Sequence, residues 1–93
     1  MAVYIDTMNA PFRGMLMCHM IADSTEELLA MADNIGVSRK WIQYPGTYKE
    51  HFDVCLSKKR LAIESYGAIE VSMHEMAIKF TSRKGNPLSQ LMK

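Results

Sequence analysis

The side chains best suited to chemistry gather in one segment of the chain, residues 51–60. Its first half holds an imidazole and a carboxylate, His51 and Asp53, and its second half holds a hydroxyl and three cations: Ser57, Lys58, Lys59 and Arg60. The pattern is typical of a loop or strand that turns into a helix. Such a junction can hold a metal ion, or it can bind an anion at the free amides that begin the helix. Chemistry is therefore expected here first.

His51 and Asp53 are two residues apart, so in an extended segment their side chains point to the same face. On one face they could ligate one cation, or Asp53 could orient His51 as a general base. The alternative is a solvated pair, with Phe52 and Val54 turned into the core, because this spacing is common by chance. The sequence leaves both interpretations open.

His19 interrupts an apolar stretch, residues 15–22. A buried histidine must satisfy both ring nitrogens, and a backbone carbonyl with a nearby carboxylate is the usual solution. The functional interpretation pairs His19 with Asp6, at the end of the preceding strand, because ligands gather at the carboxyl ends of strands in parallel sheets. Asp23 follows the apolar stretch and is a further candidate. A hydrolase hypothesis follows, in which one divalent metal activates water and is held by Asp6, His19, His51 and Asp53, with His19, His51 and Asp53 as catalytic residues.

The basic turn offers a second chemistry, the binding of phosphate. Ser57, Lys58 and Arg60 could contact phosphate oxygens at the start of a helix, and Arg13 could add another cation. Trp41 could stack on a base. The alternatives are a solvated basic face and a tryptophan in the core.

The cysteines give no comparable signal. Cys18 and His19 are adjacent and would point to opposite faces of a strand, so they cannot easily share one ion. Neither Cys18 nor Cys55 belongs to a C-x-x-C pair, which argues against structural zinc. Cys55, near a helix N-terminus, is the better candidate for a reactive thiol.

The elements that must position these groups alternate along the chain. Strands are expected at residues 3–5, 15–22, 39–43 and 68–71, with loops at 9–14 and 44–50. One helix is expected after Ser24 up to Gly36 and another after Ser72 to about Phe80, because Ser-x-x-Glu is a capping pattern at the start of helices. A helix at 57–66 is expected to have Ser57 as its cap. Glycine is expected to end helices, as at Gly36. Alternating strands and helices predict an α/β fold with about four mostly parallel strands and about three helices. The expected boundaries are a single domain, 1–81, and a polar tail, 82–93.

Composition narrows the classes of protein. The chain has 93 residues, a length that fits one domain. Its formal net charge of +1 excludes a generally basic protein that coats nucleic acid, but it is compatible with a local basic patch. No apolar run approaches the roughly 20 residues that span a bilayer. The N-terminal residues lack the pattern of a signal peptide, and two cysteines suit reduced thiols, so a cytoplasmic protein without a membrane partner is expected.

Several motifs occur in order along the chain: Val-Tyr-Ile-Asp at 3–6, Cys-His-Met-Ile-Ala-Asp at 18–23, Trp-Ile-Gln at 41–43, His-Phe-Asp at 51–53 and Ser-Lys-Lys-Arg at 57–60. Together they resemble a small uncharacterised domain family of bacteria and their phages, over about residues 3–79. The family is one of unknown function, so the resemblance implies kinship and no activity. Many members carry a second acidic residue where this chain has Thr7, which argues against a two-metal site at Asp6.

The sequence thus predicts a protein that binds a phosphate-bearing ligand, such as a nucleotide or a nucleic-acid end, at a polar cleft. One alternative is a metal-dependent phosphoester hydrolase, and another is a phage protein that acts by protein–protein contact. The cofactor is unspecified, with one divalent metal under the hydrolase hypothesis. A homodimer is compatible with a chain of this size.

Overall fold

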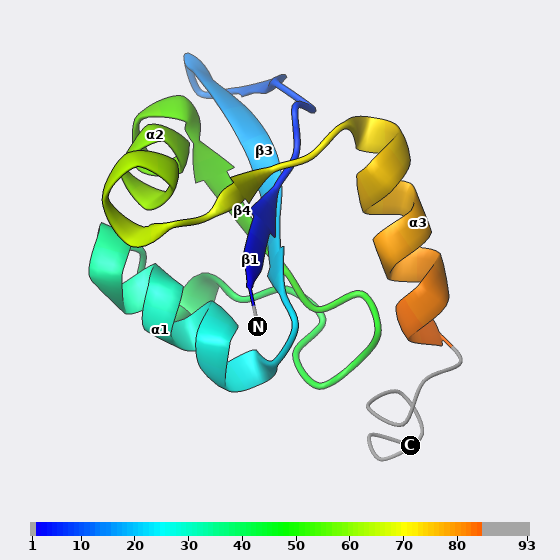
Figure 1. Cartoon of the computed structure of the whole chain (residues 1–93). Helices are drawn as coiled ribbons and strands as arrows, with labels where there is room; N and C mark the ends of the chain where they lie inside the picture. The colour runs from blue at the N-terminus through cyan, green and yellow to red at the C-terminus, as the bar shows by residue number, and fades with distance from the viewer. Residues whose placement is uncertain (1, 85–93) are drawn as a thin grey trace.

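A five-stranded sheet forms the centre of the protein, for which a computed structural model describes residues 2–84 (Figure 1). Its strands are β1 (Val3–Ile5), β2 (Ala10–Phe12), β3 (Met15–Ala22), β4 (Phe52–Cys55) and β5 (Ile69–Glu70). The long strand β3 pairs with β2 and β1 along one edge and with β4 along the other. β5 extends the sheet beyond β1.

The sheet is mostly antiparallel, so the expected parallel sheet is wrong. Only β1 and β5 run parallel, while β3 runs antiparallel to each of its three partners. Two connections explain the difference. Arg13 and Gly14, both with positive φ, close a tight hairpin between β2 and β3. The chain after β3 returns to the end of the sheet where β3 stops, because Phe52 of β4 pairs with Met20.

Helices cover both faces of the sheet, so the fold belongs to the α/β class, as expected. α1 (Thr25–Ile35) and α2 (Leu56–Tyr66) lie on one face, and α3 (Met73–Lys84) lies on the other (Figure 1). The larger core lies under α1 and α2 and includes Ile5, Met20, Leu28, Phe52 and Ala62. A smaller cluster under α3 contains Ile21, Val71 and Met76, with Tyr4 and Phe80 packed against it.

Local signals set the ends of α1. The Ser24 hydroxyl accepts a hydrogen bond from the Glu27 amide and donates one to the Glu27 carboxylate. Gly36 ends the helix in the left-handed conformation, at φ 77°. A reciprocal pair of bonds between Ser72 and Glu75 likewise begins α3. These predictions from capping patterns are confirmed.

The second helix begins differently from the prediction. Cys55 is the residue that precedes α2, and Ser57 lies inside the first turn, where its hydroxyl contacts the Cys55 thiol instead of capping the helix. α2 ends at Tyr66 and Gly67, as expected.

Four other expectations about local structure need correction. Residues 9–14 contain the strand β2, because Pro11 is tolerated on an edge strand where its missing amide is not needed. Residues 39–43 contain a 3-10 helix, Arg39–Trp41, and not a strand.

The strand expected at residues 68–71 is shorter in the structure, where it consists of β5 alone. α3 continues to Lys84, so the first residues of the expected polar tail form its last turn; residues 85–93 lie outside the described part.

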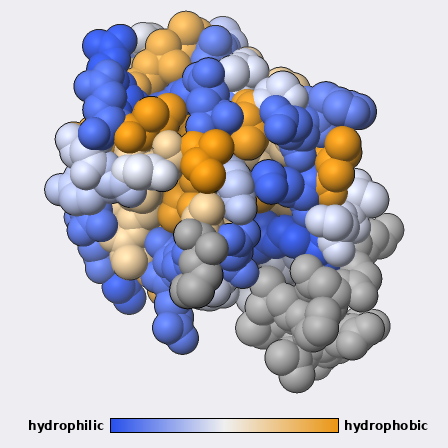
Figure 2. All heavy atoms as spheres, viewed as in Figure 1, coloured by the Kyte–Doolittle hydropathy of each residue, from blue (hydrophilic) through white to orange (hydrophobic). Residues whose placement is uncertain are grey.

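The outer surface mixes polar and apolar side chains, and the face in Figure 2 shows hydrophobic atoms in separate patches among hydrophilic ones. Trp41 is 63% exposed, which excludes the core position considered for it. None of the helices described between residues 2 and 84 has the length and apolar character that crossing a membrane requires.

We expect Ser24→Ala to lower the free energy of unfolding by about 1 kcal/mol, because both of its bonds with Glu27 are lost. The matched substitution Ser57→Ala should cost less than about 0.5 kcal/mol, because Ser57 caps nothing. Urea denaturation of both variants measures the difference. Equal losses would contradict Cys55 as the start of α2.

Candidate functional site

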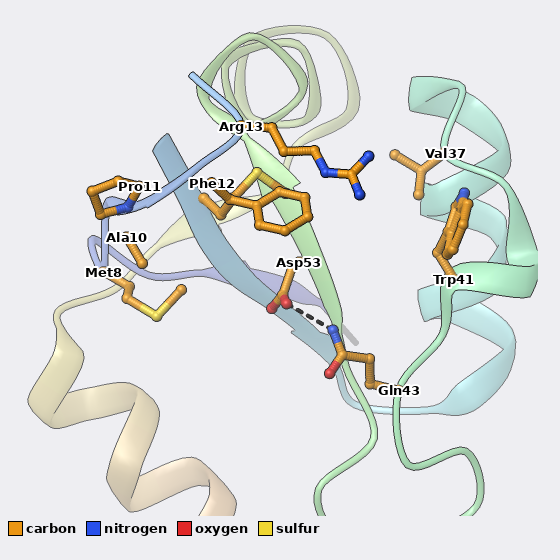
Figure 3. A pocket seen from close by; sticks show the side chains of 10 residues that line it. Met8, Ala10, Pro11, Phe12, Arg13, Val37, Trp41, Gln43 and Asp53 are labelled. Atoms are coloured by element: carbon orange, nitrogen blue, oxygen red, sulfur yellow. Dashed lines mark hydrogen bonds between the residues drawn. The ribbon is translucent and has the colours of Figure 1, made fainter. Parts of the chain in front are cut away.

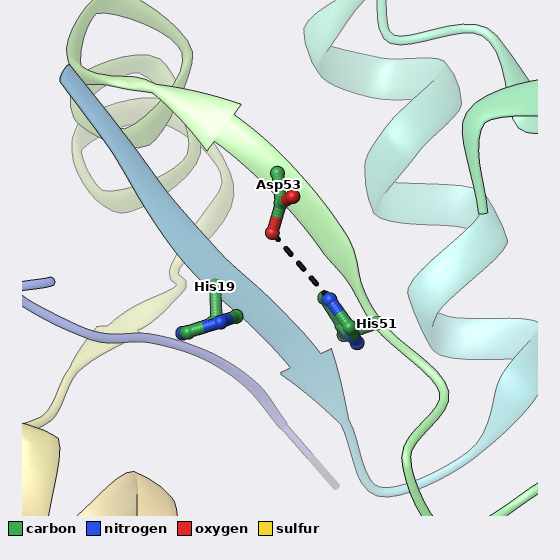
Figure 4. Close-up of side chains that lie close together, drawn as sticks. All are labelled: His19, His51 and Asp53. Carbon is green, nitrogen blue, oxygen red and sulfur yellow. Dashed lines mark ion pairs between the residues drawn. The ribbon is translucent and has the colours of Figure 1, made fainter. Parts of the chain in front are cut away.

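Three side chains meet on the face of the sheet that α3 covers. His19 of β3 and Asp53 of β4 are directly paired across the two strands, so their side chains share a face. His51 lies two residues before Asp53 and shares that face, as the spacing predicts. One potential ligand atom from each of these residues lies within 4.8 Å of the others (Figure 4). Among the described residues, they are the set that could hold a metal ion.

Asp6 fixes the orientation of His19. The Asp6 carboxylate is fully buried, and one of its oxygens lies 2.7 Å from His19 Nδ1. Its other oxygen accepts hydrogen bonds from the backbone amides of His19 and Met8. The predicted pairing of Asp6 with His19 is therefore present. Asp6 lies behind the imidazole, and it is not among the three groups that meet.

His51 is held in a similar way. Its Nδ1 lies 2.6 Å from the carbonyl oxygen of Lys49, and the Tyr44 ring stacks on the imidazole with centroids 6.1 Å apart. Burial acts to lower the pKa of His51. The Asp53 carboxylate and the Lys49 carbonyl outweigh it, and the pKa lies above its ordinary value.

Asp53 has one satisfied oxygen and one free oxygen. Gln43 Nε2 donates to Oδ2 at 2.7 Å. Oδ1 is buried and accepts no hydrogen bond within the described residues, although His51 Nε2 lies 3.4 Å away, at ion-pair range. His51 lowers the pKa of Asp53, burial opposes this, and Gln43 adds to the lowering. A buried carboxylate oxygen without a donor is costly unless a cation or proton donor approaches it.

These contacts suit a metal ion. Nδ1 of each histidine already has a partner, so Nε2 is the ring nitrogen left to bind a metal, and partners of this kind orient metal-binding histidines in general. Two ligands bound at about 2.1 Å to a tetrahedral ion lie about 3.4 Å apart. The distance from His51 Nε2 to Asp53 Oδ1 matches this separation.

α3 closes one side of the site. The Phe80 ring meets the rings of both His19 and His51 edge to face, with centroids 6.2 and 5.9 Å apart. Arg83, one turn further along α3, is buried and donates to the carbonyl of Glu50 at 3.4 Å. Burial lowers the pKa of this guanidinium. The apolar ring of Phe80 thus covers one side of both imidazoles.

A pocket of about 610 Å³ opens on the other side of the site (Figure 3). Phe12 and Arg13 of the β2–β3 hairpin line one side, and Trp41, beyond α1, lines the other. Gln43 and Asp53 line the end that adjoins the histidines. The structure therefore brings the predicted ligand residues Arg13 and Trp41 to the pocket that contains Asp53.

The predicted phosphate-binding turn is not gathered into one cluster. Ser57 contacts the Cys55 thiol, and Arg60 is exposed on α2. The Lys58 ammonium lies beside Gly36, at the end of α1. The hydrogen bond with Ser57 lowers the pKa of the Cys55 thiol, burial opposes this, and backbone bonds at the start of α2 add to the lowering.

Lys59 is a residue that the sequence did not single out. It is buried, donates to the carbonyl oxygen of Asp6 at 2.8 Å and pairs with Glu70 at 2.8 Å. It therefore ties α2 to the end of β1, behind His19. Gln43 and Phe80 were also missed as neighbours of the site. For Phe80, the apolar spacing Met76–Phe80 at i, i+4 was an available signal.

A family model with the description "Protein of unknown function (DUF4031)" matches residues 3–83. The match spans most of the chain, so the protein belongs to this family, which confirms the kinship expected from the motifs. No curated protein and no solved structure matches the chain.

We expect Asp53→Asn, with metal removed by a chelator, to destabilise the protein more at pH 6 than at pH 8.5. The raised pKa of His51 means that its ion pair with Asp53 stabilises the fold fully below about pH 6.5 and is lost as pH rises through the folded-state pKa. The lowered pKa of Asp53 keeps that carboxylate charged above about pH 4. The loss at pH 6 should be about 0.5–1 kcal/mol, because Asp53 is partly exposed. Urea denaturation at both pH values measures it; a larger loss at pH 8.5 would refute the pairing.

Proposed function

We propose that this member of the family is a hydrolase that holds one divalent transition-metal ion through His19, His51 and Asp53 and uses it to hydrolyse a phosphoester. The observation that carries the proposal is the convergence of these three groups, with both Nδ1 atoms occupied and one buried carboxylate oxygen free. A purely structural ion pair would need only His51 and Asp53. It would not require the second imidazole or its buried Asp6 partner.

The ligand set favours particular metals. Two imidazoles and one carboxylate suit Zn²⁺, Mn²⁺ or Fe²⁺ better than Ca²⁺ or Mg²⁺, which prefer oxygen ligands. Three protein ligands leave open positions for water and substrate, as catalytic sites require. A metal ion bound there would supply Lewis acidity and a nucleophilic water at neutral pH.

The surrounding residues would perform complementary tasks. Asp6 would hold His19 with Nε2 directed to the site, and Lys59 would fix the backbone of Asp6. Phe80 would keep bulk water from the imidazoles. Arg13, in the adjoining pocket, would donate hydrogen bonds to a part of the substrate away from the metal.

A second candidate function is the binding of a phosphate-bearing ligand without chemistry. The presence of Arg13 and Trp41 in one pocket favours it. This function needs no metal and predicts no turnover. The Lys58 ammonium lies beside Gly36, whose neighbour in the chain, Val37, lines this pocket, so Lys58 would add positive charge near the ligand.

Metal binding tests the first proposal directly. Titration calorimetry with Zn²⁺ or Mn²⁺ should show one site per chain, and His51→Ala should weaken binding at least 100-fold, because one of three ligands is lost. His74→Ala is the matched control, since His74 is exposed on α3, and it should leave the affinity unchanged. Equal affinities for the two variants would remove His51 from the metal site.

Asp6→Asn tests the support behind His19. The amide keeps the size of the side chain but weakens the bond that orients the imidazole, so metal affinity should fall about 10- to 100-fold. Circular dichroism establishes that the variant is folded. Unchanged affinity in a folded variant would show that Asp6 has only a structural role.

Turnover separates the two candidate functions. Bis-p-nitrophenyl phosphate and p-nitrophenyl phosphate are suitable general substrates, and release of nitrophenolate with metal-loaded protein should exceed that with the His51→Ala variant. Tight metal binding without release from either ester would overturn the hydrolase proposal and leave a metal-dependent binding protein.

A further inference from the structure

Left-handed backbone occurs at three non-glycine positions at or near the pocket and the site. Within the described residues, the non-glycine positions with positive φ are Asn9, Arg13 and Tyr44, at 51°, 50° and 51°. Arg13 lines the pocket, Tyr44 stacks on His51, and Asn9 lies between pocket residues Met8 and Ala10. Left-handed backbone is costly for Arg13 and Tyr44 but is tolerated by asparagine, and strain of this kind concentrates at functional sites. The pocket, which shares Asp53 with the metal ligands, is thus a second feature that points to a ligand.

Arg13 occupies a place that favours a different residue. It is the first central residue of the tight turn between β2 and β3, where asparagine, aspartate or glycine is preferred. Its guanidinium lies 5.3 Å from the centre of the Phe12 ring, and it has no hydrogen bond or ion pair within residues 2–84. An unpaired cation is therefore held over an aromatic wall, with its donors available.

The walls of the pocket are aromatic and exposed. Phe12 is 53% exposed and Trp41 is 63% exposed, and they lie on opposite sides of the pocket in Figure 3. Met17 and Val37 add apolar surface. The volume of about 610 Å³ falls in the range of about 300–1,000 Å³ that is usual for small-molecule sites. A flat, apolar-faced group with polar edges fits these walls, and a nucleobase is such a group.

Resting on the proposed hydrolase function, we propose that this pocket is the base subsite for a nucleoside phosphate. The base lies between Phe12 and Trp41, and Arg13 donates to acceptor atoms on its edge. The phosphate lies at the Asp53 end, beside the histidines. Asp53 lines the pocket and belongs to the group of metal ligands, so base and phosphate occupy one continuous site.

Charge makes phosphate binding depend on the metal. Without a metal, the phosphate would approach the Asp53 carboxylate, whose free oxygen repels it. A divalent ion reverses the sign of the local charge. Stacking on the aromatic walls does not depend on this charge, so the base should contribute affinity in either state.

Binding measurements test the subsite without relying on turnover. Titration calorimetry of the metal-loaded full chain should show that AMP or GMP binds at least 10-fold more tightly than ribose 5-phosphate, because stacking contributes about 1–3 kcal/mol per base. Trp41→Ala should abolish this preference, and Phe12→Ala provides a second test. Tyr66→Ala removes an exposed aromatic ring outside the pocket and should preserve the preference. Arg13→Ala should weaken binding of the nucleotides more than that of ribose 5-phosphate.

The outcomes separate this inference from the proposed function. If metal binds but ribose 5-phosphate and the nucleotides bind equally, the base subsite is wrong and the metal site stands. If no metal binds, the hydrolase is wrong, and a nucleotide preference that Trp41→Ala abolishes still supports the subsite. A preference that persists in folded Trp41→Ala and Phe12→Ala variants overturns it.

Discussion

The buried carboxylate of Asp6 is the interaction on which the rest of the site depends. A fully buried charge is tolerated only when its oxygens are hydrogen-bonded, and those of Asp6 have the imidazole of His19 and two backbone amides as partners. Lys59 adds a hydrogen bond to the carbonyl of the same residue. The end of β1, the middle of β3 and the first turns of α2 therefore meet at one point. Their relative positions determine where His19 can direct its free nitrogen.

The register between β3 and β4 completes the arrangement. Because His19 pairs with Asp53, Cys18 before His19 and Val54 after Asp53 point to the opposite face of the sheet. Both lie in the larger core. A shift of one residue in this pairing would put the imidazole and the carboxylate on opposite faces and turn the apolar side chains of one strand out of the core, so the hydrophobic pattern itself holds both polar groups on the face under α3. Stability and site geometry are thus specified by the same alternation.

Features that depend on neighbouring residues could be predicted from the sequence. The ends of α1 follow from Ser24, Glu27 and Gly36, and the shared face of His51 and Asp53 follows from their spacing. The strand direction could not be predicted, because the path of residues 36–51 back to the end of β3 depends on tertiary packing. The burial of Lys59 could not be predicted either, because a lysine inside a basic run is expected to be solvated. Its hydrogen-bond acceptor, the carbonyl of Asp6, is distant in the sequence. The strand β2 was not predicted because Pro11 indicates a loop. Proline is tolerated in a strand at the edge of a sheet, but the sequence does not show that this strand lies at an edge.

The hydrogen bond from Lys59 to the carbonyl of Asp6 joins residues 53 positions apart, and His19 meets Asp53 only after β4 has added to β3. Contacts of such long range carry a loop-closure cost that slows folding. The ligand atoms therefore do not lie together in the unfolded chain. A metal ion would bind the finished fold, so its main kinetic effect would be to slow unfolding, with little change in the rate of folding.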